Sequence, residues 1–179
     1  MIHIIGTSHS LQVWSDLRRA NTEEATRIRA FEAYIALAVT AVRAEAIAEE
    51  SSADFVACHV GGTSVALGVA ERMGLQHVYC EPDRSERLAR GLRFGGDLLV
   101  HARAIAQSTG ENEDDVWKRE VRAQFQAREA FWIERLELHG CASIHVIFVC
   151  GADHAESFAA SLRAAGIAAS IYCPDWTEL

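Results

Sequence analysis

Short apolar runs alternate along this chain with longer stretches in which apolar residues recur every three or four positions. The short runs have the length of buried strands, and the longer stretches have the spacing of helices that bury one face. Strands are therefore predicted at residues 2–5, 53–59, 76–80, 143–150 and 168–173. Helices are predicted at residues 63–73, 85–92, 97–107 and 155–165, with two long ones at 23–50 and 111–138.

The first long helix has a clear beginning. Asn21 or Thr22 can serve as its N-cap, and Glu23 and Glu24 place negative charge in its first turn. Apolar side chains then recur at helical spacing up to about Glu50. Alanines make this helix slim enough to pack closely against a neighbour, so a homodimer through the two long helices is an expectation.

The order of the elements predicts the fold class. Strands that alternate with helices are typical of α/β proteins. We expect a single α/β domain over residues 1–179, with a mainly parallel or mixed central sheet flanked by helices. In such sheets, ligands bind at the carboxyl ends of the strands. Polar residues just past the strand ends are therefore the functional candidates.

Composition and charge limit the partners. Hydrophobic residues make up 50% of the 179, charged residues 23%, and the net charge of −8 argues against a nucleic-acid partner. No apolar run approaches the ~20 residues that span a bilayer, and the first residues do not resemble a signal peptide, so no membrane partner is expected. Five cysteines without regular spacing indicate reduced thiols in the cytoplasm, most simply small buried side chains.

Two turns of the same design follow predicted strands. Gly6-Thr7-Ser8-His9 follows the first strand, and Gly151-Ala152-Asp153-His154 follows the penultimate one. In each, a glycine permits a sharp turn and a histidine ends it, which suits metal ligation or proton transfer near neutral pH. Each histidine could equally be structural, and Asp153 could simply cap the helix that follows.

A carboxylate and a guanidinium are the other candidates. Glu81 directly follows the strand at 76–80 and can ligate a cation or act as a general base. Arg128 shares a helix face with Trp132, a predicted core residue, and a buried arginine needs a carboxylate partner, for which Glu81 is the obvious choice. Alternatively, Arg128 packs over Trp132 as a partly exposed stem. The charges at 83–87 can equally be local pairs on an exposed helix start.

A glycine pair precedes the helix predicted at 63–73. Gly61-Gly62-Thr63-Ser64 could bind an anion through backbone N–H groups, with His59 beside it as a secondary candidate. The segment matches neither GxGxxG nor the GxxxxGK[ST] phosphate loop, so nucleotide binding rests on this turn only as an alternative.

Taken in order, four motifs resemble those of the TraB/TIKI superfamily, which includes erythromycin-esterase-like and ChaN-like haem-binding proteins. The motifs are GTSH at 6–9, CEPDRSER at 80–87, REAFWIERL at 128–136 and GADH at 151–154. The resemblance covers most of the chain and implies a polar site made of His9, Glu81, Arg128 and His154. Several members carry a further acidic residue near the first motif, for which the candidates are Asp16, Glu49 and Glu50.

The resemblance implies a hydrolase of the ester or peptide type, metal-dependent in some members. On that basis a divalent cation (Zn, Mn, Fe or Co) or a polarised water is expected at His9, Glu81 and His154. Arg128 would stabilise negative charge that develops on a small-molecule or peptide substrate. The residues assigned to substrate binding beside them are Ser8, Arg87 and Asp153. The alternative is a non-catalytic α/β module that binds haem or a nucleotide.

Overall fold

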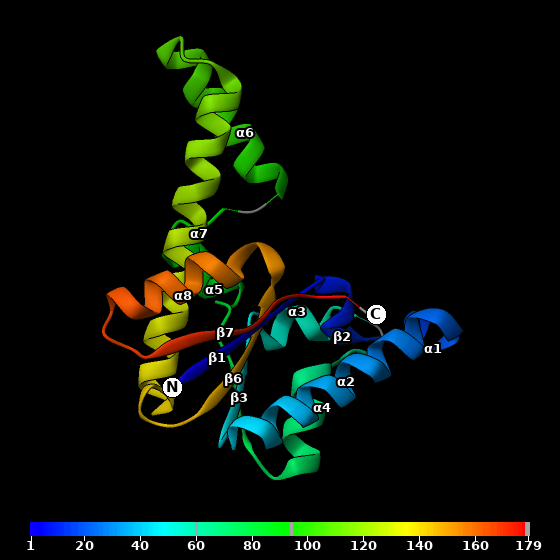
Figure 1. The fold of residues 1–179 in the computed structure, drawn as a ribbon. Coiled ribbons are helices and arrows are strands. Elements are labelled where there is room, and N and C mark those ends of the chain that lie inside the picture. The colour runs from blue at the N-terminus through cyan, green and yellow to red at the C-terminus, as the bar shows by residue number, and fades with distance from the viewer. Residues whose placement is uncertain (60, 94, 178–179) are drawn as a thin grey trace.

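The computed structural model describes residues 1–59, 61–93 and 95–177. Within these residues, five parallel strands form a central sheet in the spatial order β5-β3-β6-β1-β7 (Figure 1). They are β1 (Ile2–Thr7), β3 (Ala46–Glu49), β5 (Gln76–Tyr79), β6 (Val146–Gly151) and β7 (Ala169–Trp176). A small antiparallel pair consists of β2 (Val13–Trp14) and β4 (Thr63–Ser64). The predicted α/β class is confirmed, and the central sheet is parallel.

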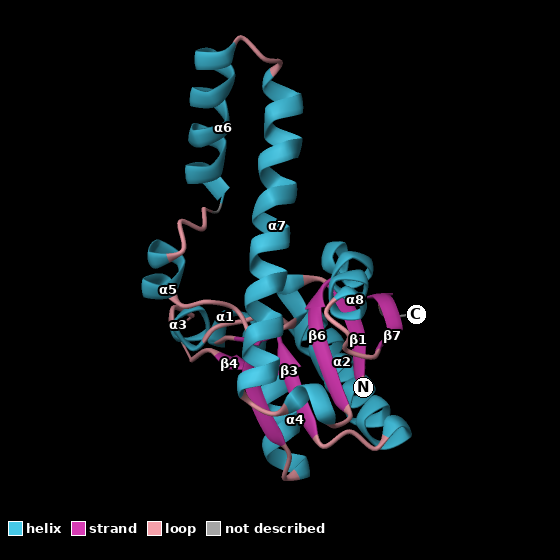
Figure 2. Ribbon diagram, turned by 90° about the vertical axis from the view of Figure 1, so that its left-hand side faces the viewer, coloured by secondary structure: helices cyan, strands magenta, loops and turns pink. Residues whose placement is uncertain are grey.

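Helices cover both faces of this sheet (Figures 1 and 2). On one face lie α2 (Thr22–Val42) and α4 (Val65–Met73), and on the other lie α8 (Ala155–Ala164) and the C-terminal half of α7 (Glu113–Leu138). The other described helices are α1 (Asp16–Ala20), α3 (Ala53–Ala57), α5 (Arg84–Ala89) and α6 (Gly95–Thr109). Short 3-10 turns are η1 (His9–Leu11), η2 (Cys141–Ser143) and η3 (Ala152–His154).

Alternating side chains of the central strands fill two separate cores. Along β6, Phe148 points into the core beneath α7 and α8, whereas Ile147 and Val149 point into the core beneath α2 and α4. Trp132 of α7 packs against Phe148 with ring centroids 5.6 Å apart, and against Phe158 of α8 at 5.1 Å. Burial of each phenylalanine contributes roughly 1.5–3 kcal/mol to stability.

A helical hairpin made of α6 and the N-terminal half of α7 projects from the body (Figure 2). Ala102, Ala106 and Val116 are buried between its two helices. Asn112 begins α7, because its side chain accepts two backbone N–H groups of the first turn. Helix α7 therefore runs from the projecting hairpin into the core, where its later residues reach the carboxyl edge of the sheet.

The first long helix ends earlier than the sequence predicts. Arg43 adopts a left-handed backbone conformation, with φ of 54°, and ends α2. Residues 46–49, which we predicted as helix, instead form β3 between β5 and β6, and all four are buried. Alanine at two of these positions fits a helical pattern, but pairing on both sides of a central strand outweighs that local preference.

The strand predicted at 53–59 is also wrong. Residues 53–57 form α3, whose N-cap is Ser52; its hydroxyl accepts the N–H of Phe55. An apolar run of this length cannot distinguish a strand from a short buried helix. The remaining predicted elements agree with the structure to within a few residues at their ends.

All five cysteines are free thiols. Cys80, Cys141 and Cys150 are buried, as expected for small hydrophobic side chains, whereas Cys58 is exposed and Cys173 is half-buried. Across the described ranges, no helix combines the length and the apolar character that a membrane crossing requires.

Candidate functional site

The carboxyl ends of β1, β5 and β6 lie at one edge of the sheet, and a candidate side chain follows each of them. His9 lies in η1 after β1, Glu81 follows β5, and His154 lies in η3 after β6. Strands β1 and β6 are neighbours, with Thr7 opposite Gly151. The two glycine–histidine turns are therefore adjacent, as the parallel arrangement predicts.

Glycine is required in both turns because other atoms approach it closely. A Cβ atom at Gly6 would lie 2.0 Å from the carbonyl oxygen of Pro174. A Cβ atom at Gly151 would lie 2.8 Å from Nε2 of His9. A side chain at either position would have to displace its neighbour, which explains why each motif begins with glycine.

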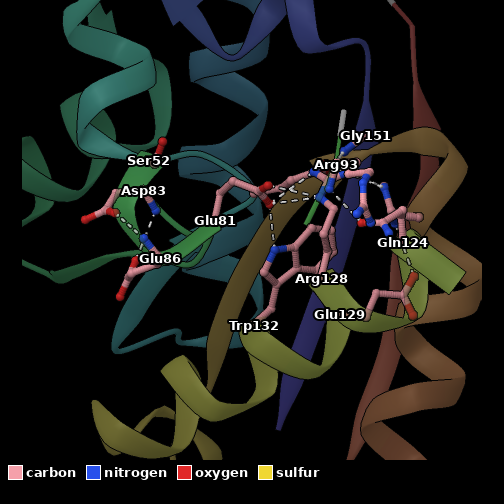
Figure 3. Close-up of polar contacts among 12 residues, drawn as sticks. Ser52, Glu81, Asp83, Glu86, Arg93, Gln124, Arg128, Glu129, Trp132 and Gly151 are labelled. Carbon is pink, nitrogen blue, oxygen red and sulfur yellow. Dashed lines mark hydrogen bonds and ion pairs between the residues drawn. The ribbon is translucent and has the colours of Figure 1, made fainter. Parts of the chain in front are cut away.

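Arg128 of α7 holds the carboxylate of Glu81 (Figure 3). Nε of Arg128 donates to Oε1 of Glu81 at 3.0 Å, and Nη2 donates to Oε2, also at 3.0 Å. Nε1 of Trp132, one turn further along α7, donates to the same Oε2 at 2.9 Å. Figure 3 shows the two α7 side chains directed at this carboxylate. The prediction that Glu81 partners Arg128 is confirmed.

Glu50 is a second carboxylate that binds the same guanidinium. It directly follows β3, its side chain is fully buried, and it accepts from Nη2 of Arg128. Its Oε2 accepts the backbone N–H of Gly151 at 2.7 Å. One arginine therefore joins the ends of β3 and β5 to α7, while Glu50 also holds the second glycine–histidine turn.

Arg128 is a permanent cation between these two carboxylates. Burial acts to lower the pKa of Arg128, but the charges and hydrogen bonds of Glu50 and Glu81 outweigh burial and raise the pKa above its usual value. Two buried carboxylates without this partner would be costly, so the three side chains form one unit.

His154 lies behind Arg128 and is held in one tautomer. Its Nδ1 is 3.1 Å from Oε1 of Glu129, a carboxylate that can only accept, so Nδ1 carries the hydrogen. Its Nε2 is 3.3 Å from Nη1 of Arg128, which can only donate, so Nε2 is the acceptor. The ring of Phe125 packs against the imidazole with centroids 4.0 Å apart and the two ring planes tilted by 31°. His154 is therefore buried against Glu129 and Arg128, with Nε2 also 3.6 Å from Oε1 of Glu50, and it positions Arg128.

Glu129 anchors that histidine. Its two oxygens accept from the hydroxyls of Ser157 and Ser161, the second at 2.8 Å. Burial acts to raise the pKa of Glu129, but hydrogen bonds from His154, Ser157 and Ser161 outweigh burial and lower the pKa. Glu129 is therefore ionised at neutral pH, which fixes the hydrogen on Nδ1 of His154.

His9 occupies the exposed rim of the site. Its side chain is 62% exposed, and its Nε2 lies 4.0 Å from Oε1 of Glu50. This separation exceeds a direct hydrogen bond. The exposed imidazole thus lies next to a carboxylate whose own side chain is fully buried.

A cavity of about 430 Å³ adjoins this network. This volume is within the usual range for small-molecule sites. Predicted site residues on its wall are His9, Glu81, Arg87 and Arg128. The wall also contains Glu50, one of the three candidates for the further acidic residue, and four residues that the sequence analysis did not assign to the site: Gln12, Ser51, Ser52 and Phe55.

Ser8 and Asp153, which we assigned to substrate binding, lie elsewhere. Ser8 is the N-cap of η1, and its hydroxyl accepts the N–H of Ser10 at 3.4 Å. Asp153 is exposed and lines a different cavity, of about 560 Å³, together with Glu129 and residues of α7. Their roles here are a turn cap and a surface carboxylate.

The three residues expected to ligate a metal do not offer a shared cation site. Arg128 lies 3.0 Å from Glu81 and 3.3 Å from His154, so a divalent ion bound to both would have to displace a guanidinium. In the part of the chain that the structure describes, no three His, Cys, Asp or Glu side chains are grouped so as to hold a metal ion. The donor set in this arrangement fits a fixed arginine and does not fit a resident metal.

Glu50 is the acidic residue beside the first motif. Glu49 precedes it on the strand and points to the opposite face, where its Oε1 lies 2.7 Å from Nε2 of His77. Asp16 forms an exposed ion pair with Arg19. Neighbouring residues of a strand point to opposite faces of the sheet, which distinguishes Glu50 from Glu49. The sequence analysis could not use this alternation, because it predicted residues 46–49 as helix.

Sequence reasoning also missed Glu129, the carboxylate that anchors His154. It follows Arg128 directly, and adjacent helix positions point in directions about 100° apart. Arg128 therefore meets the carboxylates at the strand ends while Glu129 meets His154. The remaining sequence signal is the pair of serines at Ser157 and Ser161, spaced to face one acceptor.

Backbone donors in and just after the Gly61-Gly62 turn are used within the protein. The N–H of Gly62 donates to the carbonyl oxygen of His59 at 2.7 Å, and the N–H of Val65 donates to that of Gln12 at 2.9 Å. Ser64 caps the first turn of α4. These contacts engage backbone N–H groups that the alternative of nucleotide binding would need for an anion.

The site as a whole combines an exposed imidazole, a buried carboxylate 4.0 Å from it, and a guanidinium locked behind them, beside a cavity. Such a combination can position a water and remove its proton. Comparisons of the chain with models of protein families, with curated proteins and with solved structures find no match.

Proposed function

We propose that this protein is a hydrolase of the ester or peptide type that activates water with His9 and Glu50. The observation that carries the proposal is the 4.0 Å separation between Nε2 of His9 and Oε1 of Glu50 on the wall of the cavity. A small shift of the exposed His9 side chain would let a water lie between these atoms and donate one hydrogen to each. Its lone pairs then point away from both acceptors, toward a bound substrate.

In the first chemical step, the water oxygen attacks the carbonyl carbon while Nε2 of His9 takes its proton. Glu50 stabilises the imidazolium that forms, because it is a fixed negative charge at close range. The imidazolium then gives the proton to the departing alcohol or amine, and the carbon–oxygen or carbon–nitrogen bond breaks. The products are a carboxylic acid and the leaving group, and His9 returns to its neutral form.

Arg128 acts on this step through Glu50. Its N–H groups are directed at Glu50, Glu81 and His154, so its charge serves to hold the carboxylates in place. Glu81, with both oxygens held by Arg128 and one also by Trp132, fixes the guanidinium in turn. Arg128 and His154 are positioning residues in this proposal. The stabilisation of substrate charge that the family resemblance implies for Arg128 is therefore assigned to other groups.

The proposed mechanism routes no step through a metal. The ordered motifs that resemble the TraB/TIKI superfamily support a hydrolase. Some members of that group act without a metal, so the resemblance is compatible with a mechanism in which no metal takes part. Ligation of a divalent cation by His9, Glu81 and His154 stays a prediction that metal analysis of the purified protein tests. The cytoplasmic location and the homodimer also stay predictions, and light scattering tests the second.

The test of function is hydrolysis of panels of small esters and short peptides by the wild type and by His9→Ala. Loss of a positioned general base lowers kcat by about 10²–10⁴-fold. His139→Ala is the matched control, because His139 is an exposed histidine at the end of α7, outside the cavity wall. Circular dichroism and thermal unfolding establish that each variant is folded.

Two results would remove the proposed function. One is hydrolysis by His9→Ala at the wild-type rate. The other is a folded wild type that hydrolyses no member of either panel but gives a strong visible band on titration with haem, lost in His9→Ala. The second result would establish the non-catalytic binding module instead.

A further inference from the structure

Two buried polar side chains on the cavity wall have no hydrogen-bond partner within the described ranges. They are the amide nitrogen Nε2 of Gln12 and the hydroxyl Oγ of Ser51, and each residue is only 3% exposed. A buried donor without an acceptor costs about 1–3 kcal/mol, and such groups are rare in native proteins. Neither atom is exposed to solvent, so an acceptor on a bound ligand would remove that cost after a small side-chain movement.

Backbone hydrogen bonds fix the main chain of both residues, which are close in sequence to the proposed catalytic pair. The N–H of Gln12 donates to the carbonyl oxygen of His9 at 3.2 Å, and its own carbonyl accepts from Val65 at 2.9 Å. The carbonyl of Ser51 accepts the N–H of Glu81 at 3.0 Å. Gln12 thus closes the turn that carries His9, and Ser51 directly follows Glu50.

We propose that Gln12 and Ser51 bind the carbonyl oxygen of the substrate. The catalytic part of this inference rests on the proposed hydrolase function, whereas recognition of the carbonyl does not. When water attacks, the carbonyl oxygen becomes an oxyanion, and hydrogen bonds from preorganised donors strengthen as the charge develops. When the leaving group departs with the proton from His9, the carbon–oxygen double bond re-forms and the negative charge disappears.

The charges on the cavity wall disfavour an anionic substrate, and an uncharged ester or amide is the simplest class that remains. The one positive charge of Arg128 faces two carboxylates, Glu50 and Glu81. The guanidinium of Arg87 lies 3.6 Å from a carboxylate oxygen of Asp54. No excess positive charge is left on the wall to select an anion.

Phe55 suggests what lies next to the carbonyl. It lies on the same wall, and it is 46% exposed, so its ring offers apolar surface to a ligand in the cavity. An apolar acyl or alcohol group against this ring would gain burial. The substrate class is therefore a neutral carbonyl compound with an apolar substituent.

The binding test separates the carbonyl oxygen from the rest of the ligand. The unreactive ketone p-nitrobutyrophenone and p-butylnitrobenzene, which lacks the carbonyl oxygen but keeps the nitro group, have similar size and shape, and equilibrium dialysis measures the affinity of each. The wild type is expected to bind the ketone about tenfold more tightly, the value of roughly one good hydrogen bond. Gln12→Leu and Ser51→Ala are each expected to lose most of this preference.

Thermal stability distinguishes ligand binding from a structural role, because loss of a structural side chain lowers the Tm of the protein. Replacing an unpartnered buried donor by an apolar group removes a cost, so the Tm of Gln12→Leu and Ser51→Ala should stay the same or rise. Gln76→Leu and Ser143→Ala are matched controls, because each loses a hydrogen bond to a backbone carbonyl outside this cavity. The controls should keep the ketone preference without a gain in Tm.

Hydrolysis of p-nitrophenyl butyrate distinguishes this inference from the proposed function. If the wild type hydrolyses the ester and both variants lose about a hundredfold in kcat, carbonyl binding by Gln12 and Ser51 is supported. If the wild type does not hydrolyse it but the two variants lose the ketone preference, the carbonyl site is supported without the catalysis. If both variants keep the wild-type preference for the ketone, the inference is overturned, even where His9→Ala abolishes hydrolysis.

Discussion

The imidazole of His9 packs against the bare backbone of Gly151, so the first glycine–histidine turn rests on the glycine of the second. A Cβ atom at Gly151 would lie 2.8 Å from Nε2 and 2.9 Å from Cε1 of the ring, and 3.3 Å from Oε2 of Glu50. The same residue donates its N–H to that Oε2 at 2.7 Å. Gly151 therefore sets the distance between the proposed base and its carboxylate.

Gly151→Ala is expected to lower hydrolytic activity about tenfold or more while the protein stays folded. Gly151 has φ of −59°, which alanine adopts without strain, so the added methyl group acts mainly by displacing the exposed end of the His9 side chain. Ester hydrolysis and thermal unfolding measure the two effects. Gly96→Ala is the control, since nothing lies within 4 Å of the added Cβ and alanine favours helix α6. Full activity in Gly151→Ala would contradict this role for the glycine.

Arg128→Leu is expected to lower the free energy of unfolding by about 3–5 kcal/mol, because it leaves two buried carboxylates without their cation. Glu50 and Glu81 both contact this guanidinium, and its side chain is 13% exposed. Arg103→Leu breaks an ion pair with Glu113 in which both side chains are about half exposed, and should change stability by less than about 1 kcal/mol. Urea denaturation compares the two variants. Equal losses of unfolding free energy in the two variants would show that the ion pairs of Arg128 stabilise the fold no more than an exposed pair does.

The sequence predicted the meeting of His9, Glu81, Arg128 and His154, because each follows a strand or lies on an identifiable helix face. Parallel pairing then places the strand ends at one edge regardless of local detail. The role of each residue within the site was harder to predict from the sequence. Which nitrogen of His154 carries hydrogen depends on Arg128 and Glu129, and no local pattern relates those three residues.

Glu50 shows why part of the site was missed. The stretch before it has alanines at helical spacing, and only pairing with β5 and β6 makes it a strand. That pairing is tertiary and cannot be seen in a window of local sequence. Once residues 46–49 were assigned to a helix, nothing indicated that Glu49 and Glu50 face opposite sides of the sheet.

Trp132→Phe is expected to lower the free energy of unfolding by about 1–3 kcal/mol, with most of the ring packing retained. The substitution removes the donor that lies 2.9 Å from Oε2 of buried Glu81. Trp14→Phe is the matched control, because its indole donates at 3.2 Å to Glu32, a carboxylate that water also reaches. Chemical denaturation gives both values. A larger loss in Trp14→Phe would mean that the indole of Trp132 does not matter to Glu81.

Glu129→Gln is expected to weaken the dependence of stability on pH in acid. Hydrogen bonds from His154, Ser157 and Ser161 outweigh the effect of burial and lower the pKa of Glu129 in the folded protein below its ordinary value near 4.5. A carboxyl with a depressed pKa contributes stability that is fully present above the unfolded value and is lost as pH falls through the folded value. The wild type should therefore lose more stability than Glu129→Gln as the pH falls below about 4.5.

Unfolding by urea at a series of pH values measures this difference. Glu134→Gln serves as the control, since the pKa of Glu134 is also lowered, mainly by its hydrogen bond with Arg90, but the pair is exposed and screened by water. The gap between wild type and Glu129→Gln should close on acidification, and the gap for Glu134→Gln should be small throughout. A gap for Glu129→Gln that stays constant from neutral pH into acid would mean that the Glu129 carboxylate does not hold His154 by its charge. The tautomer assigned to His154 would then lose its main support.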